Sequence, residues 1–259
     1  MEERRTDCAA GTHLVLIPSY NTGTMLFGTV AEACRYWQPV WVVIDGSTDG
    51  SGEALAGHSR QQRGLRVIFR HRNGGKGAAV LHGLRAASAE GFTHVLVMDA
   101  DGQHPASSIR DFMALSCLHP EALILGVPVF DRSAPRLRVV GRRVSNACAR
   151  LETLGAVSES LFGFRIYPIA SLQSIMESTR WMRRFDFDAE AAVRLSWHGL
   201  PVISRPVPVR YLRTGEGGVS HFRYGRDNFV LAAMHARLMA GFIRRLPRLA
   251  EQRFKPSRR

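Results

Sequence analysis

Acidic and amide side chains that could bind a divalent cation follow one apolar segment of this sequence. Asp99, Asp101 and Gln103 come directly after the apolar run 94–98. Two carboxylates two residues apart, with an amide oxygen on the same turn, supply the oxygen ligands that Mg²⁺ or Mn²⁺ prefers. We therefore expect a divalent-cation site here, although the same residues can also cap the helix that follows.

Lys76 lies in a glycine-rich segment, residues 73–77, which opens a predicted helix. Glycine lets backbone amides approach a ligand closely, and the start of a helix favours anions. The segment is not a Walker A loop, because the Gly-x4-Gly-Lys-Ser/Thr pattern is not met. Lys76 is therefore a candidate for contact with phosphates, with a simple helix cap as the alternative.

Two further polar groups follow the first two apolar runs. Pro18, Tyr20 and Asn21 come after the first run, and Asp45 directly follows the run 40–44. The carboxylate of Asp45 can accept hydrogen bonds from a sugar hydroxyl or a base imide. Asp45 is therefore a candidate for contact with a sugar or a base.

The elements that must position these groups alternate between short apolar runs and longer amphipathic stretches. The runs are rich in β-branched and aliphatic residues, as expected for parallel strands covered on both faces. We predict strands over residues 13–17, 40–44, 65–69, 94–98 and 122–127. We predict helices over residues 24–37, 50–62, 77–90 and 106–118. This order predicts an α/β fold with a mostly parallel sheet and helices on both faces, and right-handed crossovers bring the strand-end loops to one edge.

The second half of the sequence is less regular. We predict helices over residues 136–156, 186–198 and 224–246, a short extended segment over 161–167, and an edge strand over 201–211. The strand lies at an edge because Pro206 and Pro208 cannot donate to a central ladder. No apolar stretch reaches the roughly 20 residues of a membrane span. The N-terminal residues lack the apolar region of a signal peptide.

Composition bounds the class of protein. The 259 residues are 45% hydrophobic and 22% charged, which argues against a disordered chain or a coiled coil. The four cysteines form no CxxC pattern, so a disulfide framework or zinc ribbon is not expected, and reduced thiols fit a cytoplasmic protein.

Positive charge concentrates at the C-terminal end. The formal net charge is +13, and residues 203–259 hold 13 of the 35 basic but only 3 of the 22 acidic residues. A helical wheel places an apolar stripe opposite Arg237, Arg244 and Arg248; the stripe is Leu231, Met234, Leu238, Phe242 and Leu246. The pattern predicts a basic amphipathic helix, ended or kinked at Pro247, that lies in a membrane interface. A helix packed on the rest of the chain is the alternative.

In order and spacing, these groups resemble glycosyltransferase family 2, and within it the polyprenyl-phosphate (dolichyl-phosphate) mannose and glucose synthases. The likeness continues through Gly163-Phe164-Arg165, Phe187-Asp188-Ala189-Glu190 and the segment 206–209. It implies a GT-A fold, a nucleotide-sugar donor, inversion at the anomeric carbon, and an acceptor that is a lipid phosphate at the membrane surface. We expect residues 1–12 to be disordered, 13–215 to form the catalytic domain, and 216–259 to form a basic amphipathic extension.

The resemblance also implies roles for single residues. The nucleotide sugar would contact Pro18, Tyr20, Asn21, Asp45, Lys76 and Asp99. The metal would be held by Asp99, Asp101 and Gln103, and Arg165 would line the reaction centre. Candidates for a catalytic carboxylate are Asp188, Glu190 and Glu159. The arginine that often follows strand five in the synthases is Pro128 here, which moves the acceptor-phosphate role to Arg132, Arg142 or Arg143.

The sequence departs from the family pattern at three acidic positions, which are occupied by Thr22, Ile44 and Glu159. Three other functions remain open at this point: a sugar-nucleotide nucleotidyltransferase, a catalytically degenerate transferase, and a basic binding protein. No recognised nucleic-acid-binding motif accompanies the positive charge, so no specific nucleic-acid partner is expected.

Overall fold

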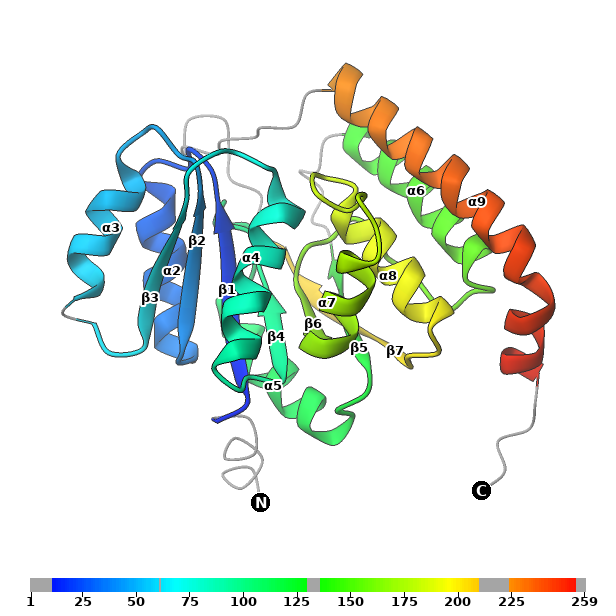
Figure 1. The fold of residues 1–259 in the computed structure, drawn as a ribbon, viewed down its shortest axis with the longest axis horizontal. Helices are drawn as coiled ribbons and strands as arrows, with labels where there is room; N and C mark the ends of the chain where they lie inside the picture. The colour runs from blue at the N-terminus through cyan, green and yellow to red at the C-terminus, as the bar shows by residue number, and fades with distance from the viewer. Residues whose placement is uncertain (1–10, 61, 130–135, 210–223, 255–259) are drawn as a thin grey trace.

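The computed structural model describes residues 11–60, 62–129, 136–209 and 224–254. Its centre is a seven-stranded sheet with the strand order β3-β2-β1-β4-β6-β5-β7 (Figure 1). The strands are β1 (His13–Ser19), β2 (Val40–Asp45), β3 (Leu65–Arg70), β4 (His94–Val97), β5 (Leu123–Val129), β6 (Arg165–Pro168) and β7 (Val202–Pro208). Only β6 runs antiparallel to its neighbours among these strands. The expected mostly parallel α/β sheet is therefore confirmed.

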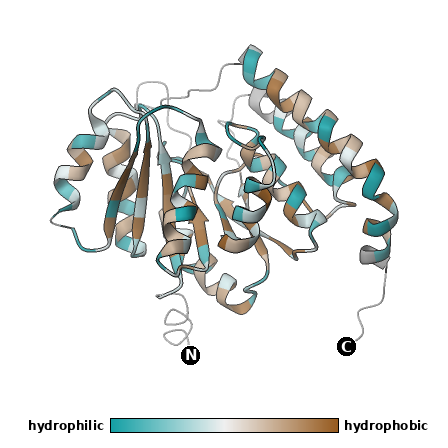
Figure 2. Ribbon diagram, viewed as in Figure 1, coloured by the Kyte–Doolittle hydropathy of each residue, from teal (hydrophilic) through white to brown (hydrophobic). Residues whose placement is uncertain are grey.

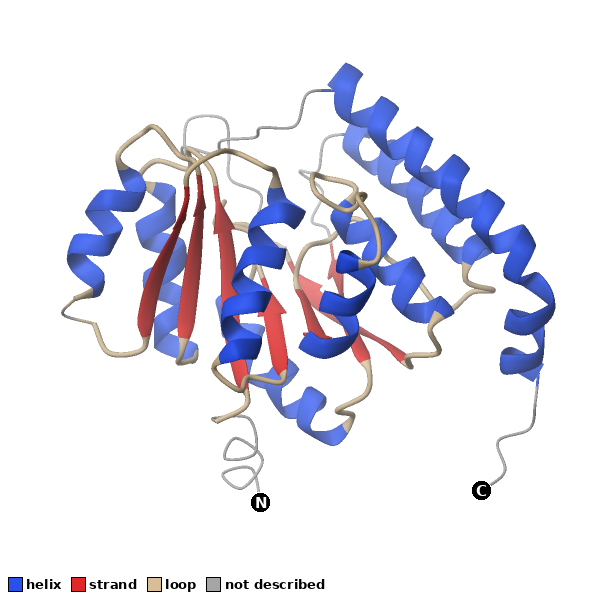
Figure 3. Cartoon of the chain, in the orientation of Figure 1, coloured by secondary structure: helices blue, strands red, loops and turns tan. Residues whose placement is uncertain are grey.

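Helices cover both faces of the sheet (Figure 3). They are α2 (Met25–Tyr36), α3 (Ser51–Ser59), α4 (Lys76–Ala89), α5 (Ile109–Leu118), α6 (Arg136–Glu152), α7 (Ile169–Glu177), α8 (Phe187–Trp197) and α9 (Tyr224–Phe254), with a short 3₁₀ turn at Ala106–Ser108. Side chains of α2, α3 and α5 fill one apolar cluster, and those of α4, α7 and α8 fill the other. Figure 2 shows the apolar strands between these layers.

The sheet register brings the strand-end loops together. Ser19 pairs with Ile44 across β1 and β2, and Asp45 pairs with Arg70 across β2 and β3. Strand β4 runs parallel beside β1, so the loop that begins at Asp99 opens at the same edge. Parallel strands joined by right-handed crossovers place their carboxyl ends on one side, which is where such sheets bind ligands.

Three features of the second half differ from the sequence-based expectations. Strand β6 is antiparallel, and helix α7 follows it directly at Ile169, where no helix was predicted. Of the two outcomes predicted at Pro247, an end of the helix is wrong, because α9 continues to Phe254. The missing N–H of a proline removes one helical hydrogen bond, but burial of Leu249 against the core favours continuation of the helix.

Most of the apolar stripe predicted for α9 packs on the protein rather than facing outward, and its last member, Leu246, is 40% exposed. Met234, Leu238 and Phe242 are at most 6% exposed and belong to the cluster beneath α4 and α8, and Leu231 packs against it. Figure 1 shows α9 lying along α6 at the end of the sheet. The prediction that this stripe meets a membrane is therefore wrong: the helix buries most of it in the core, which is the alternative stated above.

Candidate active site

A buried lysine joins two carboxylates at the carboxyl edge of the sheet. The Nζ atom of Lys76 lies 2.6 Å from Oδ1 of Asp99 and 2.7 Å from Oδ2 of Asp188. Lys76 is the first residue of α4, Asp99 follows β4, and Asp188 is in the first turn of α8. We call Lys76, Asp99 and Asp188 the ion cluster. It brings together three residues that the sequence placed in separate loops.

Lys76 and Asp99 are held in their charged forms. Burial opposes the charge on Lys76, but Asp188 and then Asp99 outweigh it and hold the pKa of the ammonium above its ordinary value. Burial also opposes ionisation of Asp99, yet Lys76 and then His104 keep the pKa of this carboxyl below its ordinary value. The other oxygen of Asp188, Oδ1, is buried and has no hydrogen-bond partner among the described residues. Such an orphaned acceptor points to a missing ligand or proton.

Asp101 lies beside the ion cluster, and the pKa of its carboxyl is shifted upward, whereas that of Asp99 is shifted downward. Burial, and then the neighbouring Asp99 carboxylate, raise the pKa of Asp101. Its Oδ1 accepts a hydrogen bond of 3.1 Å from the backbone N–H of Gln103, and its side chain stays partly exposed. Two carboxylates that repel one another at a solvent-accessible edge gain from a divalent cation between them.

The donor set fits Mg²⁺ or Mn²⁺. Asp99 and Asp101 offer only oxygen atoms, and the partly exposed amide of Gln103 lies on the same turn. No group of three or more His, Cys, Asp or Glu side chains with metal-binding geometry occurs within the described residues. A cation at this site would therefore complete its shell with water and substrate phosphates, as Mg²⁺ commonly does.

His104 is a site residue that the sequence did not single out. Its ring is buried, its Nδ1 accepts the backbone N–H of Asp99 at 2.9 Å, and its Nε2 lies 3.5 Å from Oδ2 of the same residue. Burial lowers the pKa of this imidazole, so Nε2 carries the single ring proton and faces the carboxylate. In the sequence, the position of His104 three residues after Asp101 could have identified it as a site residue.

Asp45 organises the glycine-rich loop. Its carboxylate accepts backbone N–H groups from Gly74 and from Gly75, the latter at 2.7 Å, and it also pairs with Arg70. Gly75 has a φ of 94°, which a residue with a side chain rarely adopts. Asp45 is only 2% exposed, so in this structure it shapes the loop that carries Lys76.

The loop after β1 is fixed by the loop after β2. The side chain of Asn21 accepts the backbone N–H of Thr48 at 2.7 Å, and the carboxylate of Asp49 accepts the N–H of Gly23 at 2.8 Å. Pro18, Tyr20 and Asn21 stay partly exposed on this edge, where a nucleoside could contact them.

Two of the atypical residues have structural roles. Ile44 is buried in the core of the sheet, and the hydroxyl of Thr22 shares a 2.8 Å hydrogen bond with that of Ser19. Neither side chain belongs to the ion cluster.

Arg165 and Glu159 hold the segment that faces the cluster. Arg165 is fully buried and donates to the backbone carbonyls of Phe162 at 2.7 Å and of Asp188. The carboxylate of Glu159 accepts the backbone N–H groups of Leu161 and Phe162, at 2.8 and 2.9 Å. It also accepts hydrogen bonds from the side chains of Arg142 and Asn146. Both residues therefore position the loop.

The remaining predicted residues lie apart from the cluster. Glu190 is fully buried and pairs with Arg194 at 2.7 Å and Arg237 at 3.1 Å. Arg142 and Arg143 lie on α6, where Arg143 is exposed. Arg132 lies outside the described residues.

Gly163 allows the loop to touch the ion cluster. A Cβ atom at this position would lie 2.7 Å from Oδ2 of Asp99 and closer still to Nζ of Lys76. We expect Gly163→Ala to displace the pair and to lower the turnover rate roughly 100-fold, because small misplacements in a reaction centre have such effects. The matched control is Gly28→Ala, where a Cβ meets nothing within 4 Å. Equal activity of the two variants would show that the contact is unimportant.

Among the helices of the described residues, none combines the length and apolar character required to cross a bilayer.

The chain is similar in sequence to known sugar transferases. The chain is 30% identical over 207 residues to a polyprenol monophosphomannose synthase of Mycolicibacterium smegmatis, covering 75% of this chain and 76% of that protein. It is 24% identical over 218 residues to an undecaprenyl-phosphate mannosyltransferase of Micrococcus luteus, covering 80% and 87%. These similarities confirm the predicted resemblance to sugar transferases and disfavour the nucleotidyltransferase and binding-protein alternatives.

Among solved structures, the chain is similar to glucosyl-3-phosphoglycerate synthase of Mycobacterium tuberculosis in complex with Mn²⁺ and UDP-glucose. The TM-score is 0.66 at 21% identity, with 95% of this chain and 83% of that chain covered. The likeness confirms the GT-A fold. The model of the family described as Glycosyl transferase family 2 matches residues 14–188. The chain, a glycosyltransferase by these similarities, thus belongs to glycosyl transferase family 2.

Proposed function

We propose that this protein is an inverting glycosyltransferase that uses a divalent cation to move a sugar from a nucleotide-sugar donor to a polyprenyl phosphate or similar lipid phosphate. The observation that carries this proposal is the ion cluster beside Asp101 at the carboxyl edge of the sheet. Relatives named for transfer to polyprenol and undecaprenyl phosphate support the choice of acceptor. A neighbour bound to Mn²⁺ and UDP-glucose supports the donor and the metal.

In this proposal, separate groups of residues bind the metal, position the carboxylates and hold the nucleoside. Asp99 and Asp101, with Gln103, would hold Mg²⁺ or Mn²⁺, which neutralises charge on a leaving diphosphate. Lys76 fixes Asp99 and Asp188 at the edge where that charge develops. Pro18, Tyr20, Asn21 and the loop shaped by Asp45 would hold the nucleoside.

The acceptor decides how much proton transfer is required. A lipid phosphate is already an anion, so its attack on the sugar requires no strong base. Glu159 and Glu190 have their carboxylates occupied by arginine and backbone donors, whereas Asp188 keeps the buried Oδ1 without a partner. We therefore assign to Asp188 any contact with the reacting sugar or acceptor. Arg132, Arg142 and Arg143 remain the proposed contacts of the acceptor phosphate.

We assign membrane docking to the outward faces of α6 and α9, which share only Leu246 with the stripe predicted from sequence. Exposed apolar side chains on these helices are Val144, Leu151, Phe229, Ile243 and Leu246, and exposed arginines among them include Arg143, Arg150, Arg226, Arg244 and Arg248. A surface that mixes apolar and cationic groups suits an anionic membrane interface. On this proposal residues 13–215 remain the catalytic domain and 216–259 the docking extension of a peripheral protein on the cytoplasmic leaflet.

The docking face predicts salt-sensitive binding to vesicles. Replacing both Phe229 and Ile243 with Ser should weaken co-sedimentation with anionic liposomes about 30-fold, since each exposed large side chain contributes roughly 1 kcal/mol when buried in the interface. The matched control is Leu118→Ser, because Leu118 is 53% exposed but lies on α5. Binding of the double variant at the parental level, or no binding by the parent, would contradict the assignment.

Donor binding tests the transferase proposal without any acceptor. A panel of nucleotide sugars should show at least one compound that binds in Mg²⁺ or Mn²⁺ and is released by excess chelator. Nucleotide-sugar binding that persists in excess chelator would contradict the proposed role of Asp99 and Asp101.

A further inference from the structure

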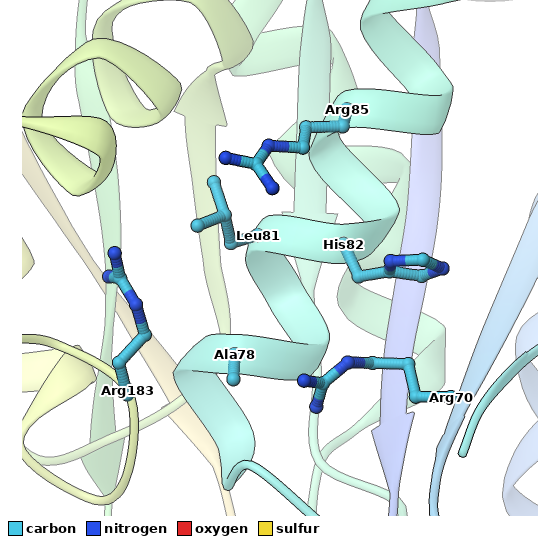
Figure 4. A pocket seen from close by; sticks show the side chains of 6 residues that line it. All are labelled: Arg70, Ala78, Leu81, His82, Arg85 and Arg183. Atoms are coloured by element: carbon cyan, nitrogen blue, oxygen red, sulfur yellow. The ribbon is translucent and has the colours of Figure 1, made fainter. Parts of the chain in front are cut away.

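A polar cavity, separate from the ion cluster, lies against the outward face of α4. Its volume is about 280 Å³, and its lining is Arg70, Ala78, Leu81, His82, Arg85 and Arg183. Figure 4 shows the three guanidinium groups and the imidazole arranged around Ala78 and Leu81 of the helix. No carboxylate belongs to this lining.

The nearby carboxylates are engaged outside the cavity. Asp45, which pairs with Arg70, is tied to the backbone of the glycine-rich loop. Asp186 accepts backbone N–H groups from Met182 and Arg184. Glu177 pairs with Arg85 through the single Nε atom at 2.8 Å, which leaves the outer edge of that guanidinium available.

The cationic groups also repel one another across the cavity. Burial, and then the charge of Arg85, lower the pKa of Arg183. Burial, and then the charges of Arg70 and Arg85, lower the pKa of the His82 imidazole. An anion placed among these groups would remove the repulsion that these shifts report.

We propose that this cavity is an anion site, separate from the reaction centre, that takes a phosphate or diphosphate group. Guanidinium groups approach from three elements: β3, α4 and the segment between α7 and α8. Hydrogen bonds to the backbone carbonyls of Trp181, Met176 and Thr179 fix the guanidinium of Arg183 at the cavity, and Arg70 is paired with Asp45. The open edge of Arg85 therefore supplies the fork that binds an oxyanion, and Arg70 and Arg183 add positive charge from two other directions. The volume of about 280 Å³ is large enough for a diphosphate.

The site is connected to the loop that carries Lys76. The backbone carbonyl of Arg183 accepts the N–H of Ala78 at 2.9 Å, two residues after Lys76. Arg70 holds Asp45, which in turn holds Gly75. An anion that contacts Arg70 and Arg183 together therefore ties the start of α4 to its two neighbouring segments. This inference does not depend on the proposed acceptor.

Titration of the intact protein with inorganic pyrophosphate, in the presence of chelator, tests the site. Calorimetry should detect one binding event, and Arg85→Gln should weaken it about tenfold, since a charge-assisted hydrogen bond is lost. Glu177→Gln should instead strengthen it about threefold, because it releases Arg85. The matched control, Arg66→Gln, removes an exposed arginine paired with Glu90 and should leave binding unchanged.

Two further arms locate the anion and identify its source. Asp101→Asn should leave the affinity for pyrophosphate unchanged, whereas tighter binding in that variant, as expected when a carboxylate beside the anion is neutralised, would move the anion to the reaction centre and overturn the proposal. If orthophosphate binds as pyrophosphate does, the site takes a free phosphate group. If only a nucleoside diphosphate binds, the proposal is overturned. Parental affinity in Arg85→Gln, with unchanged circular dichroism, also overturns it.

Discussion

Asp101→Asn should lower the rate of sugar transfer roughly 1,000-fold, because a bound cation contributes several kcal/mol to a reaction that develops charge on phosphates. The substitution removes a carboxylate whose pKa is raised by burial and by Asp99. Relief of that repulsion means that the variant should unfold at the parental temperature or slightly above it. Single-turnover transfer measured beside thermal unfolding separates the two effects.

The matched control for Asp101→Asn is Asp111→Asn, an acidic residue in the first turn of α5 that lies outside the site. It should transfer sugar at the parental rate. Parental turnover by Asp101→Asn, or undiminished turnover of the parent in excess chelator, would contradict the metal assignment.

Lys76→Met should destabilise the fold by about 3 kcal/mol, the lower end of the effect of breaking a buried ion pair. The change leaves the buried carboxylate of Asp188 and the partly exposed carboxylate of Asp99 without their shared cation. Urea unfolding at neutral pH measures the loss, and donor binding should weaken with it because Lys76 opens α4 beside the glycine-rich loop.

The pH dependence of the Lys76→Met effect has a definite sign. In the parent, Lys76 holds the folded-state pKa of Asp99 below its ordinary value, so this stabilisation is present above that ordinary value and is lost as pH falls through the lowered pKa. The variant lacks it, so the difference between the two proteins should narrow on acidification. The double variant Lys76→Met/Asp99→Asn should recover part of the stability. A difference that stays constant with pH would show that packing, not charge, causes it.

Much of the fold follows from local patterns in the sequence. The strands β1, β2 and β4 are continuous apolar runs buried on both faces, so their positions were predicted within two residues. The edge position of β7 followed from Pro206 and Pro208. The direction of β6 and the existence of α7 depend on packing between distant segments, which no local period reports.

The site was predictable in its members but not in its contacts. Asp99, Asp101 and Lys76 stand at strand ends, and parallel strands must bring them to one edge. The contact between Lys76 and Asp188 joins residues 112 positions apart, and only the tertiary structure reveals it. The stripe on α9 was misread because burial in a core and burial in a membrane demand the same apolar period.

The most direct test is transfer of a labelled sugar to undecaprenyl phosphate in detergent, where membrane docking is not required. The protein, Mg²⁺ and the donor that binds in the nucleotide-sugar panel should yield a labelled lipid that extracts into organic solvent. The product should be absent with chelator and with Asp101→Asn. If the lipid stays unlabelled while a water-soluble phosphate or sugar acceptor receives the label, the proposed acceptor is wrong.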